Sequence, residues 1–115
     1  MHEVGILTQA LEMAEEAAAR ESARRILRLK LRVGALAGVV PEAMAFAFDV
    51  VSKGTLAEGG VFEWEEVAVL CRCRSGCPDF HPEDTAVFAC PVCGTPSWEV
   101  LEGRELHLIE VEVET

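Results

Sequence analysis

The chain has 115 residues, half of them hydrophobic, and a formal net charge of −10. This length suits one domain with at most a small appended module, and this apolar content excludes wholesale disorder. The acidic excess argues against nucleic-acid binding, because a polyanionic surface repels phosphates, and no apolar run is long enough to span a bilayer.

The first predicted element is an amphipathic helix over residues 4–20. Its apolar side chains recur at spacings of three and four, which places them on one face. The N-terminus lacks the basic region of a signal peptide, so we expect the chain to stay in the cytoplasm, where thiols remain reduced. The buried stripe of this helix is expected to contain Val4, Leu7, Leu11, Ala14 and Ala18.

Residues 26–33 alternate between apolar and basic side chains, a pattern typical of a half-buried strand. The basic face has two interpretations. It is a solvated surface, or it docks against an acidic partner or against the chain's own acidic strands. We expect Leu27, Leu29, Leu31 and Val33 on the inner face, and Arg28, Lys30 and Arg32 on the outer one.

A second helix is predicted to begin at Pro41, which suits the first turn, and to end near Gly54, which suits a C-terminal cap. It would bury some of the residues Met44, Ala47, Phe48 and Val51. Further strands are expected at residues 61–69, 99–101 and 106–113, and the last of them should return to the first sheet.

This order of elements predicts an α+β fold. We expect a small mixed sheet packed by two helices, with a zinc-ribbon-like module inserted between two strands. The predicted domain division is residues 1–66 plus 104–115 for the sheet and helices, and residues 67–103 for the module.

All five cysteines lie in this inserted segment, which has few residues that could form a core. Clustered cysteines in a reducing compartment indicate a metal site, and a metal can stabilise a segment with little core of its own. Cys90-Pro-Val-Cys93-Gly is the clearer half, because two thiolates at this spacing can converge on one ion. Four thiolates favour a closed, structural Zn(II) site, although a rubredoxin-type iron site also suits these ligands.

The other half of the cysteine pattern is irregular. We expect Cys73 and Cys77 to complete the zinc site with Cys90 and Cys93, because Cys71 falls where the preceding strand ends. Cys71 is interpreted as a spare or buried thiol and His81 as a loop histidine. Either could still serve as an alternate ligand.

The chain opens with Met1-His2-Glu3. A terminal amine, a backbone amide nitrogen and the imidazole of His2 can form adjacent chelate rings, a nitrogen-rich set that suits Ni(II) or Cu(II). Glu3 could add an oxygen ligand or a hydrogen bond to a ligand.

Taken together, these blocks resemble the HypA/HybF family of nickel metallochaperones for nickel–iron hydrogenase maturation. The resemblance covers essentially the whole chain. It rests on Met1-His2-Glu3, on residues 33–39 leading into Pro41-Glu42-Ala43, on Phe46-Ala47-Phe48-Asp49, on residues 54–59, and on the cysteine module.

The resemblance implies that the N-terminal domain binds Ni(II) through His2 and nearby backbone nitrogens, with Glu3 close by. It implies a structural zinc module, a nickel-binding GTPase and the hydrogenase large subunit as partners, and no enzymatic activity. The chain departs from the family pattern at Val40, where many relatives have a carboxylate that Glu42 or a water could replace. It departs again in the three residues between Cys73 and Cys77, where two are usual.

Two other classes of function compete with this interpretation. A zinc-ribbon interaction module without a nickel role would share the cysteine pattern and would be indifferent to His2. An enzyme has little support, because the sequence contains no nucleophile motif and no glycine-rich phosphate loop. The chain is expected to be a monomer or a homodimer, and the sequence leaves open whether urease is also served.

Overall fold

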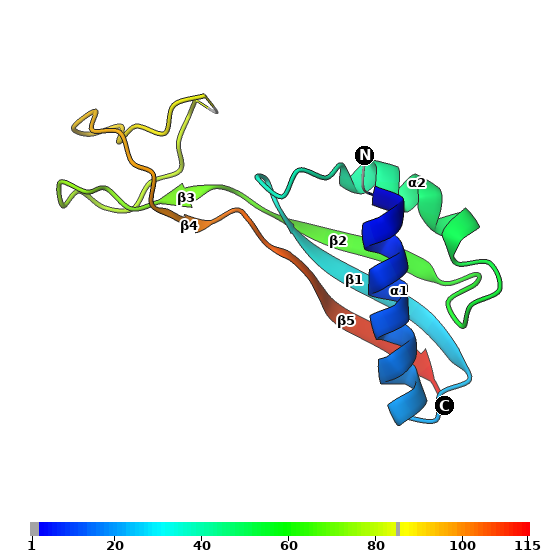
Figure 1. The fold of residues 1–115 in the computed structure, drawn as a ribbon. Coiled ribbons are helices and arrows are strands. Elements are labelled where there is room, and N and C mark those ends of the chain that lie inside the picture. Colours follow the sequence, from blue (N-terminus) through cyan, green and yellow to red (C-terminus); the bar gives the residue numbers. More distant parts are fainter. Residues whose placement is uncertain (1–2, 85) are drawn as a thin grey trace. The chain divides into compact units, whose positions relative to one another are not determined.

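The computed structural model describes residues 3–84 and 86–115, which form two compact units. The first unit contains residues 3–32, Gly38–Glu65 and Leu106–Thr115, and the second contains Val33–Ala37 and Glu66–Glu105. Across the described ranges, no helix is long and apolar enough to cross a membrane. The elements are α1 (Glu3–Arg20), β1 (Arg25–Gly34), α2 (Pro41–Val51), β2 (Val61–Val67), β3 (Leu70–Cys71), β4 (Val100–Glu102) and β5 (Leu106–Glu114) (Figure 1).

The larger sheet has the strand order β2-β1-β5. Arg24, just before β1, donates its N–H to the carbonyl of Glu114 at the end of β5, at 2.8 Å, so β5 runs antiparallel to β1. Ala35, just after β1, donates to the carbonyl of Val67 at the end of β2, at 2.9 Å, so β2 runs parallel to β1. The predicted mixed sheet and the return of the last strand to it are confirmed.

Both helices pack on one face of this sheet (Figure 1). The core of the first unit lies between the helices and the sheet. α1 supplies its predicted small and branched side chains, α2 supplies Phe48, and the ring of Phe48 stacks on Phe62 of β2 at 5.6 Å. These contacts follow from the helical and strand periodicities of the sequence. The buried cluster consists of Leu7, Leu11, Ala14, Ala18, Ile26, Leu29, Phe48 and Ala57.

Three details of the elements differ from the expectation. Val4 is 47% exposed while Glu3 is 8% exposed, because the Glu3 carboxylate turns inward to accept a hydrogen bond from Val40. Ile26 is fully buried while Leu27 is half-buried, since the segment that contains Ala57 covers the start of β1. α2 ends at Val51, earlier than expected.

The outer face of the sheet is charged. Arg28 contacts three carboxylates, those of Glu63 at 2.8 Å, Glu110 at 2.7 Å and Glu112 at 3.2 Å. Arg32 contacts Glu65 at 2.7 Å. The basic face of β1 therefore pairs with the chain's own acidic strands, one of the two interpretations of the sequence pattern.

The second unit contains the antiparallel pair β3 and β4 and a small cluster of buried side chains. Residues 33–37 group with this unit, because Leu36 donates to the carbonyl of Gly103 at 2.7 Å and Ala35 to that of Val67. A methyl group at Gly34, the last residue of β1, would overlap the backbone of Gly103, which follows β4, so these two backbone segments approach too closely for a side chain at Gly34. The core of this unit is formed by Cys71, Cys73, Phe80 and Cys90.

Candidate metal centre

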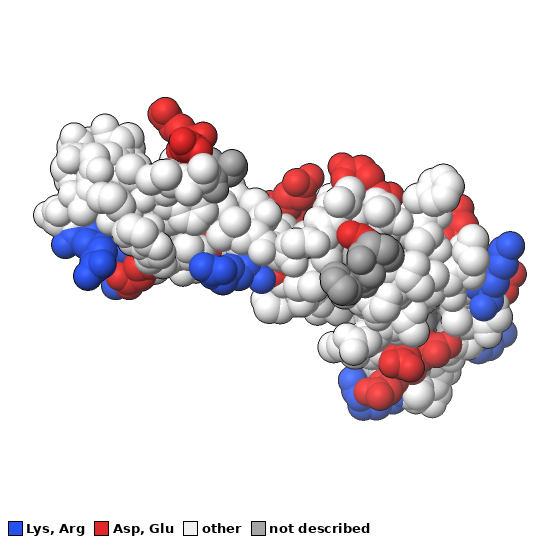
Figure 2. All heavy atoms as spheres, turned by 45° about the horizontal axis from the view of Figure 1, so that its top comes forward, with Lys and Arg blue, Asp and Glu red and all other residues white. Residues whose placement is uncertain are grey.

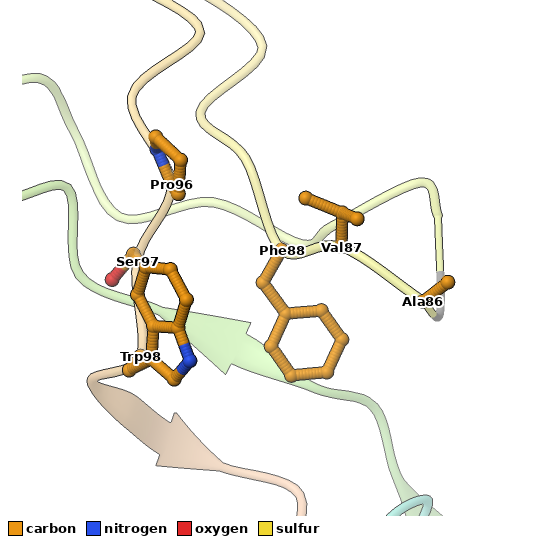
Figure 3. Close-up of a pocket in the computed structure, with 6 residues that line it drawn as sticks. All are labelled: Ala86, Val87, Phe88, Pro96, Ser97 and Trp98. Atoms are coloured by element: carbon orange, nitrogen blue, oxygen red, sulfur yellow. The ribbon is translucent and has the colours of Figure 1, made fainter.

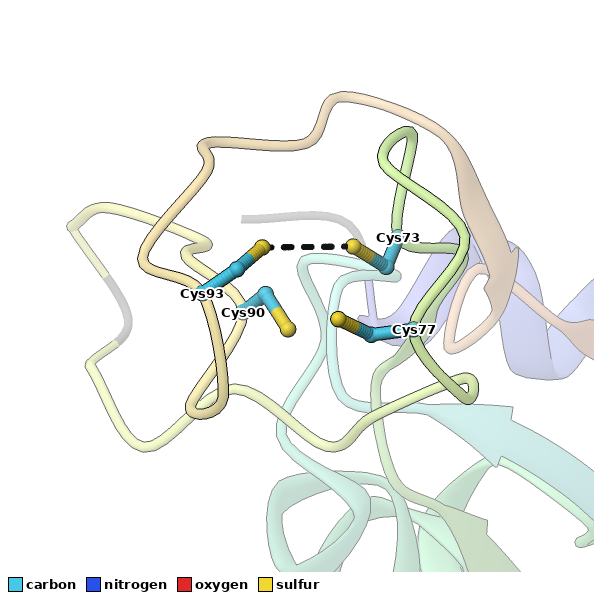
Figure 4. Close-up of side chains that lie close together, drawn as sticks. All are labelled: Cys73, Cys77, Cys90 and Cys93. Atoms are coloured by element: carbon cyan, nitrogen blue, oxygen red, sulfur yellow. Dashed lines mark hydrogen bonds between the residues drawn. The ribbon is translucent and has the colours of Figure 1, made fainter.

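Four of the five cysteines converge in the second unit (Figure 4). Their sulfur atoms all lie within 4.8 Å of one another, and the sulfurs of Cys73 and Cys93 are 3.6 Å apart. A tetrahedral zinc site with Zn–S bonds of about 2.3 Å places its sulfurs about 3.8 Å apart. The spacing in the structure therefore fits a metal of this size. The four residues are those predicted from the sequence: Cys73, Cys77, Cys90 and Cys93.

The irregular first arm is accommodated by a turn directly after β3. Gly76 has a φ of +94° and donates its N–H to the carbonyl of Cys73 at 3.3 Å. A glycine adopts this left-handed conformation without steric cost. The turn absorbs the extra residue of the first arm and brings the sulfur of Cys77 back toward that of Cys73.

The second arm is a tight knuckle. Gly94 has a φ of +77° and donates its N–H to the carbonyl of Cys90 at 2.8 Å, while Val92 donates its N–H to the sulfur of Cys90 at 3.4 Å. Cys93 lies beside Thr95, with 3.2 Å between the sulfur and the hydroxyl oxygen. The role of Thr95 was missed in the sequence, because a threonine after a glycine carries no distinctive pattern.

The thiols of the cluster differ in pKa. The hydroxyl and the N–H of Thr95 lower the pKa of Cys93 to about 6, and N–H groups of the knuckle lower that of Cys90. Hydrogen bonds to the sulfurs of Cys93 and Cys90 raise the pKa of Cys77 to about 12. Four adjacent thiolates repel one another, so a cation must displace the last protons. The cluster therefore has the chemistry of a metal site.

The two alternate ligands lie outside the cluster. Cys71 is fully buried and pairs through its backbone with Phe80, and burial raises the pKa of its thiol. His81 is exposed, and its Nδ1 lies 2.7 Å from the carbonyl oxygen of Val69, so this nitrogen donates its proton there. Neither side chain joins the four sulfurs.

The predicted nickel ligands fall at the start of the chain. Met1 and His2 lie outside the described residues. Glu3 opens α1, and its Oε2 accepts a hydrogen bond from the N–H of Val40 at 3.1 Å. Val40 is the N-cap residue of α2, so this carboxylate joins the starts of the two helices. Glu42, the proposed replacement for a carboxylate at position 40, is exposed.

A hollow of about 200 Å³ in the second unit is a different kind of site (Figure 3). The side chains of Phe88 and Trp98 face each other across it. Ser97 donates its hydroxyl to the carbonyl of Arg72, and Trp98 brings an indole N–H. The described lining of the hollow is therefore mostly apolar. Its lining consists of Ala86, Val87, Phe88, Pro96, Ser97 and Trp98.

Comparison with known proteins identifies one family. The model of the family described as "Hydrogenase/urease nickel incorporation, metallochaperone, hypA" matches residues 1–113. A hydrogenase maturation factor HypA from Picosynechococcus sp. is 43% identical over 113 residues, which cover 98% of this chain and 99% of that protein. The protein of the same name from Roseiflexus sp. is 40% identical over 114 residues, which cover 99% and 93% of the two chains.

Solved structures share the fold. The solution structure of the nickel metallochaperone HypA from Helicobacter pylori matches with a TM-score of 0.66 at 20% identity, covering 100% of this chain and 99% of that one. A second solution structure, of a HypA protein, matches with a TM-score of 0.71 at 19% identity, covering 98% and 96%. The α+β architecture predicted from the sequence is confirmed by these matches.

Proposed function

The chain belongs to the HypA family of hydrogenase/urease nickel incorporation metallochaperones, and we propose that it binds Ni(II) at its N-terminus and delivers it during maturation of nickel–iron hydrogenase. The observation that carries this proposal is that the family match begins at residue 1 and so includes Met1-His2-Glu3. Nickel is the cargo here. No bond of an organic substrate is broken, so the chain acts as a carrier and not as an enzyme.

The proposed nickel site uses the terminal amine of Met1, backbone nitrogen and the imidazole of His2. Nitrogen ligands of this kind suit the tetragonal geometry that Ni(II) prefers. The position of Glu3 supports the proposal, because its buried carboxylate is tied to Val40 directly beside this segment. Glu3 is then placed to orient the nickel ligands or to add an oxygen ligand.

The proposed second metal is a structural Zn(II) held by the four-cysteine cluster. Closed sites with four thiolates are typical of structural zinc, and they supply folding free energy to small domains. Support comes from the composition of the second unit's core, which is mostly cysteine. When bound, the ion would join the turn after β3 to the knuckle of Cys90 and Cys93.

Delivery requires partners, and we propose two. A nickel-binding GTPase of the maturation machinery and the hydrogenase large subunit would each contact this protein in the cytoplasm. The names of the relatives, hydrogenase maturation factors, support an assignment to this process.

A Ni(II) titration of the zinc-loaded protein with an untagged N-terminus tests the proposal. We expect one nickel per chain for the wild type, loss of nickel with retained zinc for His2→Ala, and wild-type binding for His107→Ala, whose side chain lies exposed on β5. Equal binding by the wild type and His2→Ala, or binding by neither, would overturn the proposal. The protein would then be a zinc-stabilised interaction module without nickel transfer.

A further inference from the structure

α2 presents a row of apolar side chains to solvent. Phe46 is 88% exposed and Val50 is 68% exposed, although the same helix buries Met44 and Phe48 almost completely. Burying a phenylalanine or valine side chain away from water is favourable, so this exposure leaves free energy available for an association. Single exposed apolar residues are common, but a contiguous row indicates a contact surface.

The row follows one side of the helix. Ala43, Phe46 and Val50 are separated by three and four residues, so they lie one above the other, and all three are exposed. We call these three residues the α2 stripe. Glu42 and Asp49, both exposed, lie seven residues apart and form an acidic row along one border of the stripe. Exposed apolar surface beside a line of like charges is the composition of a protein-docking face.

The charges decide which occupant fits. A second copy of this chain would bring Glu42 and Asp49 close to another acidic surface, in a protein whose net charge is −10. Like charges across an interface are repulsive, whereas basic side chains opposite them steer association and fix its orientation. Figure 2 shows the acidic side chains in several separate groups, some beside uncharged surface and others beside lysine or arginine side chains.

We propose that the α2 stripe docks a protein partner that presents an apolar groove bordered by lysine or arginine side chains. This inference rests on the proposed function, because the partner would be one of the two proteins that exchange nickel with this chain. The stripe is well placed for such an exchange. α2 begins at Val40, and Val40 is hydrogen-bonded to Glu3, the residue after His2.

Two variants and a control test the proposal. Phe46→Ser removes the most exposed aromatic ring, and Asp49→Lys reverses one charge of the border. The matched control is Met13→Ser, an exposed apolar residue on α1 at 55% exposure. The nickel-binding GTPase and the hydrogenase large subunit of the same organism are purified and titrated separately, by calorimetry, into the full-length zinc-loaded protein.

For one of these partners we expect Phe46→Ser to weaken binding at least about tenfold, the equivalent of one lost buried side chain. Asp49→Lys should weaken the same binding, with a larger effect at low salt than at high salt, because salt screens charges at a surface. Met13→Ser should bind like the wild type. All three variants should melt at the wild-type temperature, because the substituted side chains are exposed.

Three results would overturn the proposal. Binding of both partners by Phe46→Ser with wild-type affinity would show that the stripe is not used. Failure of the wild type to bind either partner would exclude it as their docking face. A wild-type dimer in sedimentation that Phe46→Ser converts to a monomer would identify a second copy as the occupant. A nickel titration of each variant separates these results from a failure of the nickel proposal.

Discussion

Thr95→Val should weaken zinc binding in a manner that depends on pH. The sulfur of Cys93 lies 3.2 Å from the hydroxyl oxygen of Thr95 and, as a thiol, donates to it. Once Cys93 is ionised, the hydroxyl can donate to the thiolate instead, and this hydrogen bond is the largest reason that the pKa of Cys93 falls to about 6. Valine has nearly the same shape as threonine and lacks the hydroxyl. The substitution therefore removes this hydrogen bond, and also the one between the hydroxyls of Thr95 and Ser75 at 3.2 Å, with little change in packing. The bond to Ser75 involves no titrating group, so its loss should not depend on pH.

The size of the effect follows from the pKa. If the hydroxyl accounted for the whole shift, the pKa of Cys93 would return to about 8.5 in the variant. At pH 7 the thiolate fraction would fall from about nine-tenths to about 0.03, which is about a 30-fold loss of zinc affinity. This is an upper bound, because the N–H of Thr95 also lowers the pKa and remains in the variant.

The sign of the pH dependence is fixed by the direction of the shift. A lowered pKa favours metal binding most where the unperturbed thiol would still be protonated, so the difference between wild type and variant grows as the pH falls from 9 toward 6. At pH 9 both thiols are mostly ionised and the affinities should agree within about twofold.

Competition for zinc with a chelator of known affinity measures this effect at a series of pH values. Thr8→Val is a suitable control, because the hydroxyl of Thr8 donates within α1, to the carbonyl of Val4 at 2.8 Å. An affinity ratio that is the same at pH 6.5 and pH 9 would refute the reasoning. The loss would then come from altered packing and not from the charge on Cys93.

Three further predictions concern nickel, charge and packing. Nickel occupancy should fall between about pH 7.5 and pH 5 in equilibrium dialysis, because imidazole and amide nitrogen must lose protons to bind; unchanged occupancy at pH 5 would contradict this. Arg28→Met should lower the melting temperature more at pH 7 than at pH 3. The hydrogen bond from Arg28 lowers the pKa of Glu110, so this stabilisation exists above the ordinary carboxyl pKa and is lost as the pH falls through the lowered one; an equal drop at both pH values would disagree. Phe48→Ala should lower the free energy of unfolding by about 3–5 kcal/mol in denaturant titrations, while Phe46→Ala changes it by less than about 0.5 kcal/mol, and similar values for the two would be incompatible with their burial.

The architecture could be predicted because each element carries its own periodicity. The apolar spacing of α1 and the alternation of β1 indicate their type and buried face before any tertiary contact is known. The exceptions are residues whose orientation depends on a distant segment. Glu3 turns inward because Val40 offers an N–H, and Ile26 is buried because the segment of Ala57 covers it. Pairs of this kind leave no local pattern in the sequence.

In the metal cluster, too, some features could be predicted from the sequence and others depend on the folded structure. The choice of Cys73 over Cys71 follows from where a strand ends, and the structure brings the sulfur of Cys73 to the other three. The unequal pKa values of the thiols depend on which N–H and O–H groups surround each sulfur. The hydroxyl of Thr95 becomes important only once the knuckle has folded, so its role could not be inferred from spacing.

The close approach of Gly34 to Gly103 has a consequence for how this chain can change in evolution and in the laboratory. Ala35 holds the end of β2 through Val67, and Leu36 holds Gly103, so the two ends of the cysteine-bearing segment are fixed within the second unit's own backbone. Loop-closure entropy depends only weakly on length once the ends of a loop are fixed. We therefore expect that residues 68–102 can be lengthened, shortened or replaced by another metal-binding segment at a small cost in folding free energy. A side chain added at Gly34 would separate the backbones of Gly34 and Gly103 and so disrupt the hydrogen bonds that fix the two ends of this segment.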